Sequence, residues 1–258
     1  MENKDLKPIA NVAVDSTAGV LGVLAALVNP MMGIAASGFL PVLVSNLKDF
    51  IARKLSNNED YRLGTTAWVA CQKIKGYLDS GREVRNDDFW TCPESKRSKA
   101  DIVCEGILLK IRDEYEDKKL IYYSNFLANI GFEESVSYEQ ANMLLKLSER
   151  LSYRQLVILA YLSDDKILEM NSWAVQFKNN LLLEGYYDWY SEIMSLYDYG
   201  LLKQSMERKG IELGRCANSQ ISVLGKTLSH LMELNTIPLD DIQEVSATLE
   251  KIKNMIRK

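Results

Sequence analysis

Hydrophobic residues recur at helical spacing through most of this chain, and the pattern predicts a protein built mainly from α-helices. Residues 101–130 are one example, with apolar side chains three, four or seven residues apart. These are Leu108, Ile111, Tyr115, Tyr122, Phe126 and Ile130. The spacing predicts a single long helix over 101–130, with Gly131 as a left-handed residue that ends it.

Capping signals mark further helices. Ser137 with Gln140, and Ser152 with Gln155, have the spacing of a capping box, in which each side chain binds the other residue's backbone N–H. Asn57 or Asn58 is the expected cap of a helix that ends before residues 79–81. Together with the apolar periodicity, these signals predict helices at about 57–78, 137–151, 152–160, 167–181, 191–199, 222–234 and 240–257.

Strand-like texture is confined to residues 201–205 and 219–223, on either side of a loop. A helix ending at Gly200-Leu201-Leu202, this loop and a helix start at Ser222-Val223-Leu224-Gly225 resemble winged-helix proteins over residues 152–234. In DNA-binding relatives the helix before the wing enters the major groove. Here residues 191–199 carry Glu192 and Asp198 but no Lys or Arg, so groove binding is not expected. The basic wing residues are candidate contacts to a partner: Arg208, Lys209 and Arg215.

Residues 16–47, the apolar segment, contain no Asp, Glu, Lys or Arg, and no other stretch of the chain is as apolar. Asn29-Pro30 near its middle is a turn signal, so the segment is expected to form a hairpin of two short helices at about 17–28 and 31–47. The first helix is too short to span a bilayer, which takes about 20 apolar residues, and the second is marginal.

Small residues in the apolar segment would let two helices approach closely, whether in lipid or in a protein core. The candidate membrane or oligomer contacts are Gly22, Leu24, Ala26, Met31, Gly33, Ile34, Ser37 and Phe39. A helix that is apolar all round is buried either in protein or in a membrane. Two interpretations stay open: a membrane-active hairpin, or a hairpin that is core or oligomer interface of a helical protein.

Composition and charge narrow the function classes. The 258 residues carry a formal net charge of −4, which does not indicate a general nucleic-acid-binding surface. His230 is the only histidine, which argues against histidine-based metal sites and catalytic triads. The four cysteines have no Cys-x-x-Cys spacing and are expected to be reduced thiols. No catalytic residue, cofactor or metal site is predicted.

The element order also resembles a known family. The Gly- and Ala-rich apolar segment is followed by residues 119–129 (KLIYYSNFLAN), residues 151–156 (LSYRQL) and the winged-helix-like region. Over residues 16–234 this order resembles bacterial proteins grouped as abortive-infection alpha-type, and the resemblance implies a role in phage defence.

The predicted fold class is therefore all-α: a helical bundle with an N-terminal hydrophobic helical hairpin and a small winged-helix-like C-terminal module. The predicted domains are residues 1–56, 57–151 and 152–258. The predicted function is that of a cytoplasmic or inner-membrane-associated, non-enzymatic defence protein that acts at the membrane through its hairpin. The alternative is a soluble, oligomeric protein-interaction or transcription-regulatory module. A protein partner or a second copy of the chain is expected, a membrane is a further candidate, and nucleic acid is not expected.

Overall fold

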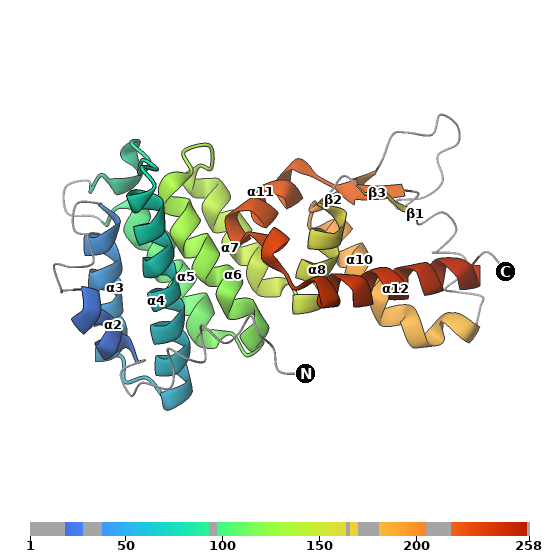
Figure 1. The fold of residues 1–258 in the computed structure, drawn as a ribbon, viewed down its shortest axis with the longest axis horizontal. Coiled ribbons are helices and arrows are strands. Elements are labelled where there is room, and N and C mark those ends of the chain that lie inside the picture. Colours follow the sequence, from blue (N-terminus) through green and yellow to red (C-terminus); the bar gives the residue numbers. More distant parts are fainter. Residues whose placement is uncertain are drawn as a thin grey trace. The chain divides into compact units, whose positions relative to one another are not determined.

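The protein is mostly helical, and the computed structural model describes residues 19–27, 38–92, 97–163, 166–169, 181–204 and 218–256 (Figure 1). Its contacts divide the chain into two compact units, Met1–Arg150 (unit 1) and Leu151–Lys258 (unit 2). The described elements of unit 1 are α2 (Val20–Leu27), α3 (Phe39–Ala52), α4 (Asn57–Asp79), η3 (Asp88–Trp90), α5 (Lys99–Asp113), η4 (Asp117–Lys119), α6 (Leu120–Asn129), η5 (Ile130–Phe132) and α7 (Tyr138–Arg150), where η marks a 3₁₀ turn.

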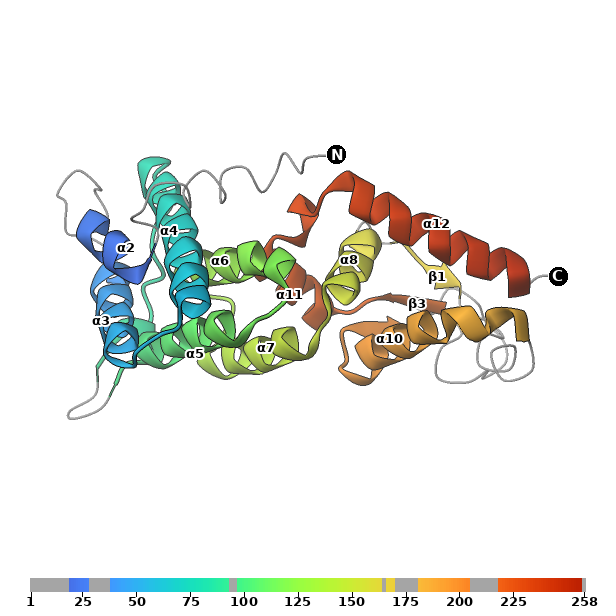
Figure 2. The same cartoon turned by 90° about the horizontal axis from the view of Figure 1, so that it is seen from below.

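Unit 1 is a helical bundle. Helix α4 packs against α2, α5 and α6, while α3 packs against α2 and α5, and α7 packs against α5 (Figures 1 and 2). Capping boxes begin three of its helices, at Ser56, Ser98 and Ser137. The cap of α4 is Ser56 rather than Asn57 or Asn58, because the Ser56 hydroxyl accepts the Glu59 N–H and the Glu59 carboxylate accepts the Ser56 N–H.

Helix α6 is enclosed within unit 1, and all of its residues except Ile121 are buried. Its buried amides are paired, as buried polar groups must be. The Lys73 ammonium donates to Asn125 Oδ1 at 2.9 Å, and the Tyr77 hydroxyl donates to Asn129 Oδ1 at 2.6 Å. These bonds fix α6 against α4.

The predicted single helix over 101–130 is wrong, because α5 ends at Asp113 and α6 begins at Leu120. Residues 114 and 116 have extended backbones, and Tyr115 between them is 83% exposed rather than part of an apolar stripe. The break is held by a buried ion pair, in which Lys119 Nζ lies 2.5 Å from Glu114 Oε2. Gly131 does not end the helix in a left-handed conformation either; it lies within the turn η5.

Unit 2 combines helices with a small antiparallel sheet. Its described elements are α8 (Tyr153–Leu162), β1 (Leu168–Glu169), η6 (Leu181–Tyr186), α10 (Tyr187–Asp198), β2 (Leu202–Gln204), β3 (Asn218–Ile221), α11 (Val223–Met232), η7 (Leu234–Thr236) and α12 (Leu239–Ile256). The strands β2 and β3 lie in the two regions predicted from the sequence. They pair with Leu202 opposite Ile221, and β1 joins the other edge of β3 with Leu168 opposite Ser219. The helix predicted to begin at Ile167 is wrong at its start, because Leu168 is in β1.

Two glycines of unit 2, Gly200 and Gly225, lie where the end of α10 meets the start of α11. Gly200 has a φ of +73°, a left-handed conformation that favours glycine. The Ser222 hydroxyl donates to the Gly200 carbonyl and accepts the Gly225 N–H, so Ser222 caps α11 and ties it to the end of α10. A Cβ at Gly225 would collide with the Leu201 carbonyl oxygen, so this close approach needs a glycine.

Candidate functional site

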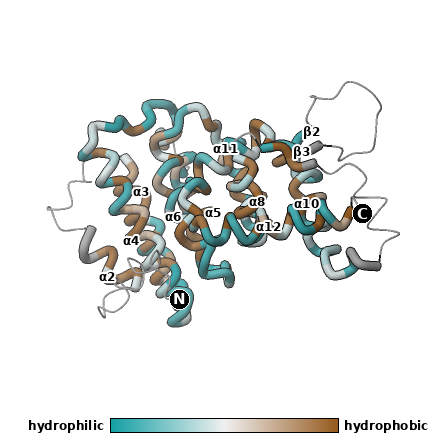
Figure 3. Tube along the Cα trace, turned by 45° about the vertical axis from the view of Figure 1, so that its right-hand side comes forward, coloured by the Kyte–Doolittle hydropathy of each residue, from teal (hydrophilic) through white to brown (hydrophobic). Residues whose placement is uncertain are grey.

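The described part of the apolar segment lies against other helices of unit 1. Helix α2 has a wholly apolar sequence, in contrast to the mixed sequence of α4 (Figure 3). Val20, Val23 and Leu24 of α2 are buried, whereas Leu21 on the same helix is 68% exposed. One face of α2 is therefore covered by protein and another is not.

A carboxylate from α4 caps the start of α2. The Val20 N–H donates to Asp60 Oδ1 at 3.0 Å, so a side chain 40 residues further along the chain satisfies one of the unpaired N–H groups of the first helical turn. A Cβ on Gly19 would overlap Asp60 Oδ2, so this position needs a glycine for the carboxylate to come close. Because the carboxylate is also negative, it lies favourably at the positive end of the helix.

Helix α3 also buries one face in unit 1. Its core side chains are 3% exposed or less, and they are Phe39, Leu43, Leu47 and Phe50. The Phe39 ring packs edge-on against Trp90, with centroids 5.8 Å apart. A Cβ at Gly131 would lie 2.9 Å from Phe39 Cδ2, so glycine at this position leaves room for the ring. Close packing of this kind is typical of a protein interior.

Only some of the predicted contact residues fall within the described chain. Gly22 is half-buried, Leu24 and Phe39 are buried in unit 1, and Ala26 lies on α2 with its side chain outside the description. The remaining candidates of the apolar segment, Met31, Gly33, Ile34 and Ser37, lie outside the described residues. The same holds for the three basic wing residues, Arg208, Lys209 and Arg215.

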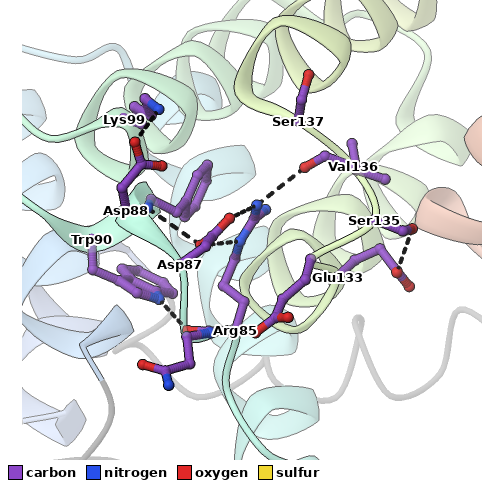
Figure 4. Close-up of polar contacts among 12 residues, drawn as sticks. Arg85, Asp87, Asp88, Trp90, Lys99, Glu133, Ser135, Val136 and Ser137 are labelled. Atoms are coloured by element: carbon purple, nitrogen blue, oxygen red, sulfur yellow. Dashed lines mark hydrogen bonds and ion pairs between the residues drawn. The ribbon is translucent and has the colours of Figure 1, made fainter.

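A buried arginine organises the loop that covers the start of α3 (Figure 4). The Arg85 side chain is 2% exposed and donates to both carboxylate oxygens of Asp87. It also donates to the carbonyl oxygens of Ile130 and Val136, at 3.3 and 3.2 Å, and its guanidinium lies 4.1 Å from the centre of the Phe89 ring. The planar guanidinium thus joins residues 85–89 to the segment that follows α6.

Arg85 also positions Trp90. The indole N–H of Trp90 donates to the Arg85 carbonyl oxygen at 2.9 Å, and this places the ring over Gly38 and Phe39. The mixed charges of residues 82–99 predict a solvated linker whose charges pair with one another. The pairing is present, between Arg85 and Asp87 and between Lys99 and Asp88. The solvated interpretation is wrong for the loop around Arg85 and Phe89, which are both buried. The adjacent aromatics Phe89 and Trp90 were the available signal, because large apolar rings in a charged stretch usually pack.

A three-residue charge cluster links α3 and α5 on the surface of unit 1. Glu105 Oε1 pairs with Arg53 and Oε2 pairs with Arg97, each at 2.5 Å. Hydrogen bonds from these two guanidinium groups hold the pKa of Glu105 below its usual value, against the opposing effect of burial. The Glu105 side chain is 21% exposed, so solvent screens the cluster only in part.

The lowered pKa predicts that unit 1 loses stability in acid. A carboxylate with a depressed folded-state pKa contributes stability that is present above its unfolded pKa of about 4.3 and is lost as pH falls through the folded value. We expect Glu105→Gln to show a smaller fall in melting temperature between pH 5 and pH 3 than the wild type. Glu83→Gln, which changes an exposed carboxylate outside this cluster, is the matched control and should follow the wild type. Equal pH dependence in all three proteins would contradict the assignment.

In unit 2 a single arginine engages the acidic residues of α10. Arg154 Nε donates to Glu192 Oε2 at 2.6 Å, and another nitrogen of the group donates to Asp188 Oδ2 at 2.8 Å. The guanidinium also lies 4.7 Å from the ring centre of Trp189. Both carboxylates are therefore held between α8 and α10, while Tyr187 on the same helix is 58% exposed.

Two cysteines, whose thiols could in principle be nucleophiles, lie in the core of unit 1. Cys71 and Cys104 are free thiols in the core, and burial raises the pKa of Cys71 to about 12, so it stays protonated and poorly nucleophilic near neutral pH. Among the residues that the structure describes, no group of His, Cys, Asp and Glu side chains has the arrangement of a metal site. Within the same residues, no helix is both long enough and apolar enough to cross a membrane.

Comparisons with known proteins add no relative. No protein-family model matches the chain, and neither the curated proteins nor the solved structures contain a significant match.

Proposed function

We propose that this chain is a non-enzymatic protein of bacterial phage defence that acts through protein contacts, with its apolar segment sheltered in unit 1. The observation that carries the proposal is the packing of that segment. Six apolar residues of the segment, from α2 and α3, are buried: Val20, Val23, Leu24, Phe39, Leu43 and Leu47. Apolar surface already removed from water has no hydrophobic drive to enter lipid. This favours the core interpretation of the segment over the membrane-active one.

The winged-helix-like character of unit 2 belongs to the same proposal. Along the chain, α8 and β1 come first, then α10, the β2–β3 hairpin and α11. The sheet order β1-β3-β2, with both pairs antiparallel, supports a wing built on β2 and β3. Helix α10 immediately before the hairpin then takes the place of the groove-reading helix in DNA-binding relatives.

The chemistry of α10 favours a protein partner over DNA. The helix carries Asp188, Glu192 and Asp198 and no Lys or Arg, so it offers no cation to phosphate. Arg154 is committed to two of these carboxylates. Partly exposed aromatic side chains remain, and Tyr187 is the most exposed of the large apolar side chains on this helix. Aromatic residues of this kind are enriched in protein interfaces.

A second candidate function is action at a membrane, as the sequence first indicated. Leu21 favours it, because this leucine is 68% exposed on a helix without any polar side chain. In this alternative α2 would be the first part of the apolar segment to meet lipid. The defence role itself is supported by the resemblance to abortive-infection alpha-type proteins and is common to both candidates.

A phage-plating assay tests the proposed function. We expect at least one phage of a broad panel to form plaques less efficiently on a bacterial host that expresses the chain than on the same host with an empty vector. Tyr187→Ala should reduce this protection, because it removes an exposed aromatic anchor from α10. The matched control is Leu239→Ala, which truncates a side chain of unit 2 that is 66% exposed but lies on α12.

Two outcomes contradict the proposal. The defence role is wrong if the wild type leaves every phage of the panel unaffected. The protein-contact assignment is wrong if purified protein shifts a DNA fragment site-selectively at nanomolar concentration and physiological salt, and that result would move unit 2 to transcription regulation.

A further inference from the structure

Helix α2 differs from the other helices of unit 1 in how it is held. It has eight residues, and isolated helices shorter than about 12 residues are marginal in water, so its helical state depends on docking. Three of its side chains are buried, Val20, Val23 and Leu24, and Leu21 faces solvent. Helix α3 has 14 residues, and besides α2 it packs against α5.

The polar tie between α2 and α4 is the Asp60 cap. Among the residues that the structure describes, the bond from the Val20 N–H to Asp60 Oδ1 is the side-chain hydrogen bond that joins these two helices. The carboxylate lies where a Cβ on residue 19 would overlap it, so any other residue at position 19 would require the Asp60 side chain to move. Gly19 and Asp60 therefore set this hydrogen bond, while Val20, Val23 and Leu24 supply the apolar part of the contact.

We propose that α2 is a detachable cover of unit 1, whose docking is set by the Asp60 cap, while α3 stays in the core. Undocking would unfold α2 and uncover the apolar surface of α3 and α4 on which it packs. The rest of unit 1 keeps its own contacts: α4 with α5 and α6, α3 with α5, and α5 with α7. In this proposal α2 is the releasable part of the apolar segment and α3 is the permanent part. The proposal does not depend on the defence role.

Hydrogen exchange of the full-length protein, measured by mass spectrometry, tests the proposal. We expect Asp60→Ala to speed the exchange of α2 amides by roughly fivefold, the effect of losing a typical helix cap, while α3 and α6 keep wild-type rates. Asp60→Asn should exchange nearly as slowly as the wild type, because asparagine retains an acceptor oxygen. Asp79→Ala is the matched control, since it removes a 61%-exposed carboxylate at the other end of α4.

A second variant makes the test independent of Asp60 itself. Gly19→Ala should speed exchange in α2 as Asp60→Ala does, because the new methyl group pushes the carboxylate away from the Val20 N–H. The proposal is overturned if either variant leaves exchange in α2 unchanged. It is equally overturned if exchange rises to the same extent in α2, α3 and α6, since α2 would then be an inseparable part of the core.

Discussion

We expect Arg85→Ala to lower the free energy of unfolding of unit 1 by about 3 kcal/mol. The substitution leaves the carbonyl oxygens of Ile130 and Val136 without their donor, and an unpaired buried acceptor costs about 1–3 kcal/mol. It also removes the bidentate partner of Asp87 and the cation above the Phe89 ring. Urea-dependent hydrogen exchange of the α6 amides measures the effect, because α6 is enclosed within unit 1.

Two further variants separate the network from simple loss of charge. Arg85→Lys keeps the charge but not the planar fork of donors, so most of the destabilisation should remain. Arg97→Ala removes an arginine that is 50% exposed and ion-paired with Glu105, and exposed pairs contribute at most about 1 kcal/mol. If Arg85→Ala and Arg97→Ala cost the same, Arg85 would not be the structural centre of its loop.

The parts of the fold that were predicted correctly depend on short-range signals. The capping boxes at Ser137 and Ser152 and the strand texture around residues 202–204 and 218–221 act over a few residues, so sequence alone contains them. The break between α5 and α6 was missed because it depends on burial of the Glu114–Lys119 pair. Charged residues read as a solvated helix face unless the fold encloses them.

The candidate site was predictable in composition but not in arrangement. Sequence showed that residues 16–47 must be buried somewhere, since their apolar side chains have no charged neighbours. It could not show that Asp60 caps α2 or that Trp90 covers Phe39, because these contacts join residues 40 to 51 positions apart.

The pairing of Arg154 shows a similar limit in unit 2. The acidic character of residues 191–199 was visible in the sequence, and it is the basis of the prediction that this helix makes no phosphate contacts. The sequence does not show which arginine pairs with Glu192 and Asp188. The structure shows that it is Arg154 of α8, because α8 packs against α10. The pair gives α10 a fixed place beside α8, and Tyr187 on the same helix stays exposed.

Two lysine substitutions, Leu43→Lys and Leu21→Lys, test whether the apolar segment is part of the protein core or acts in a membrane. We expect Leu43→Lys to unfold unit 1, because Leu43 is fully buried and an unpaired buried charge costs several kcal/mol. Leu21→Lys places the same charge on a side chain that is 68% exposed, and it should change the free energy of unfolding by no more than about 0.5 kcal/mol. Hydrogen exchange of the α6 amides reports both effects.

Liposome flotation of the same proteins completes the comparison. If the apolar segment is sheltered in unit 1, the wild type and Leu21→Lys should both stay in the aqueous fraction, because the buried face of α2 and all of the α3 core are already covered. A charge at Leu21 matters only where this side chain meets lipid, since moving it there would cost about 2.5–3.5 kcal/mol at the bilayer centre. A wild type that floats, together with a folded Leu21→Lys variant that does not, would contradict the sheltered arrangement and establish the membrane-acting alternative.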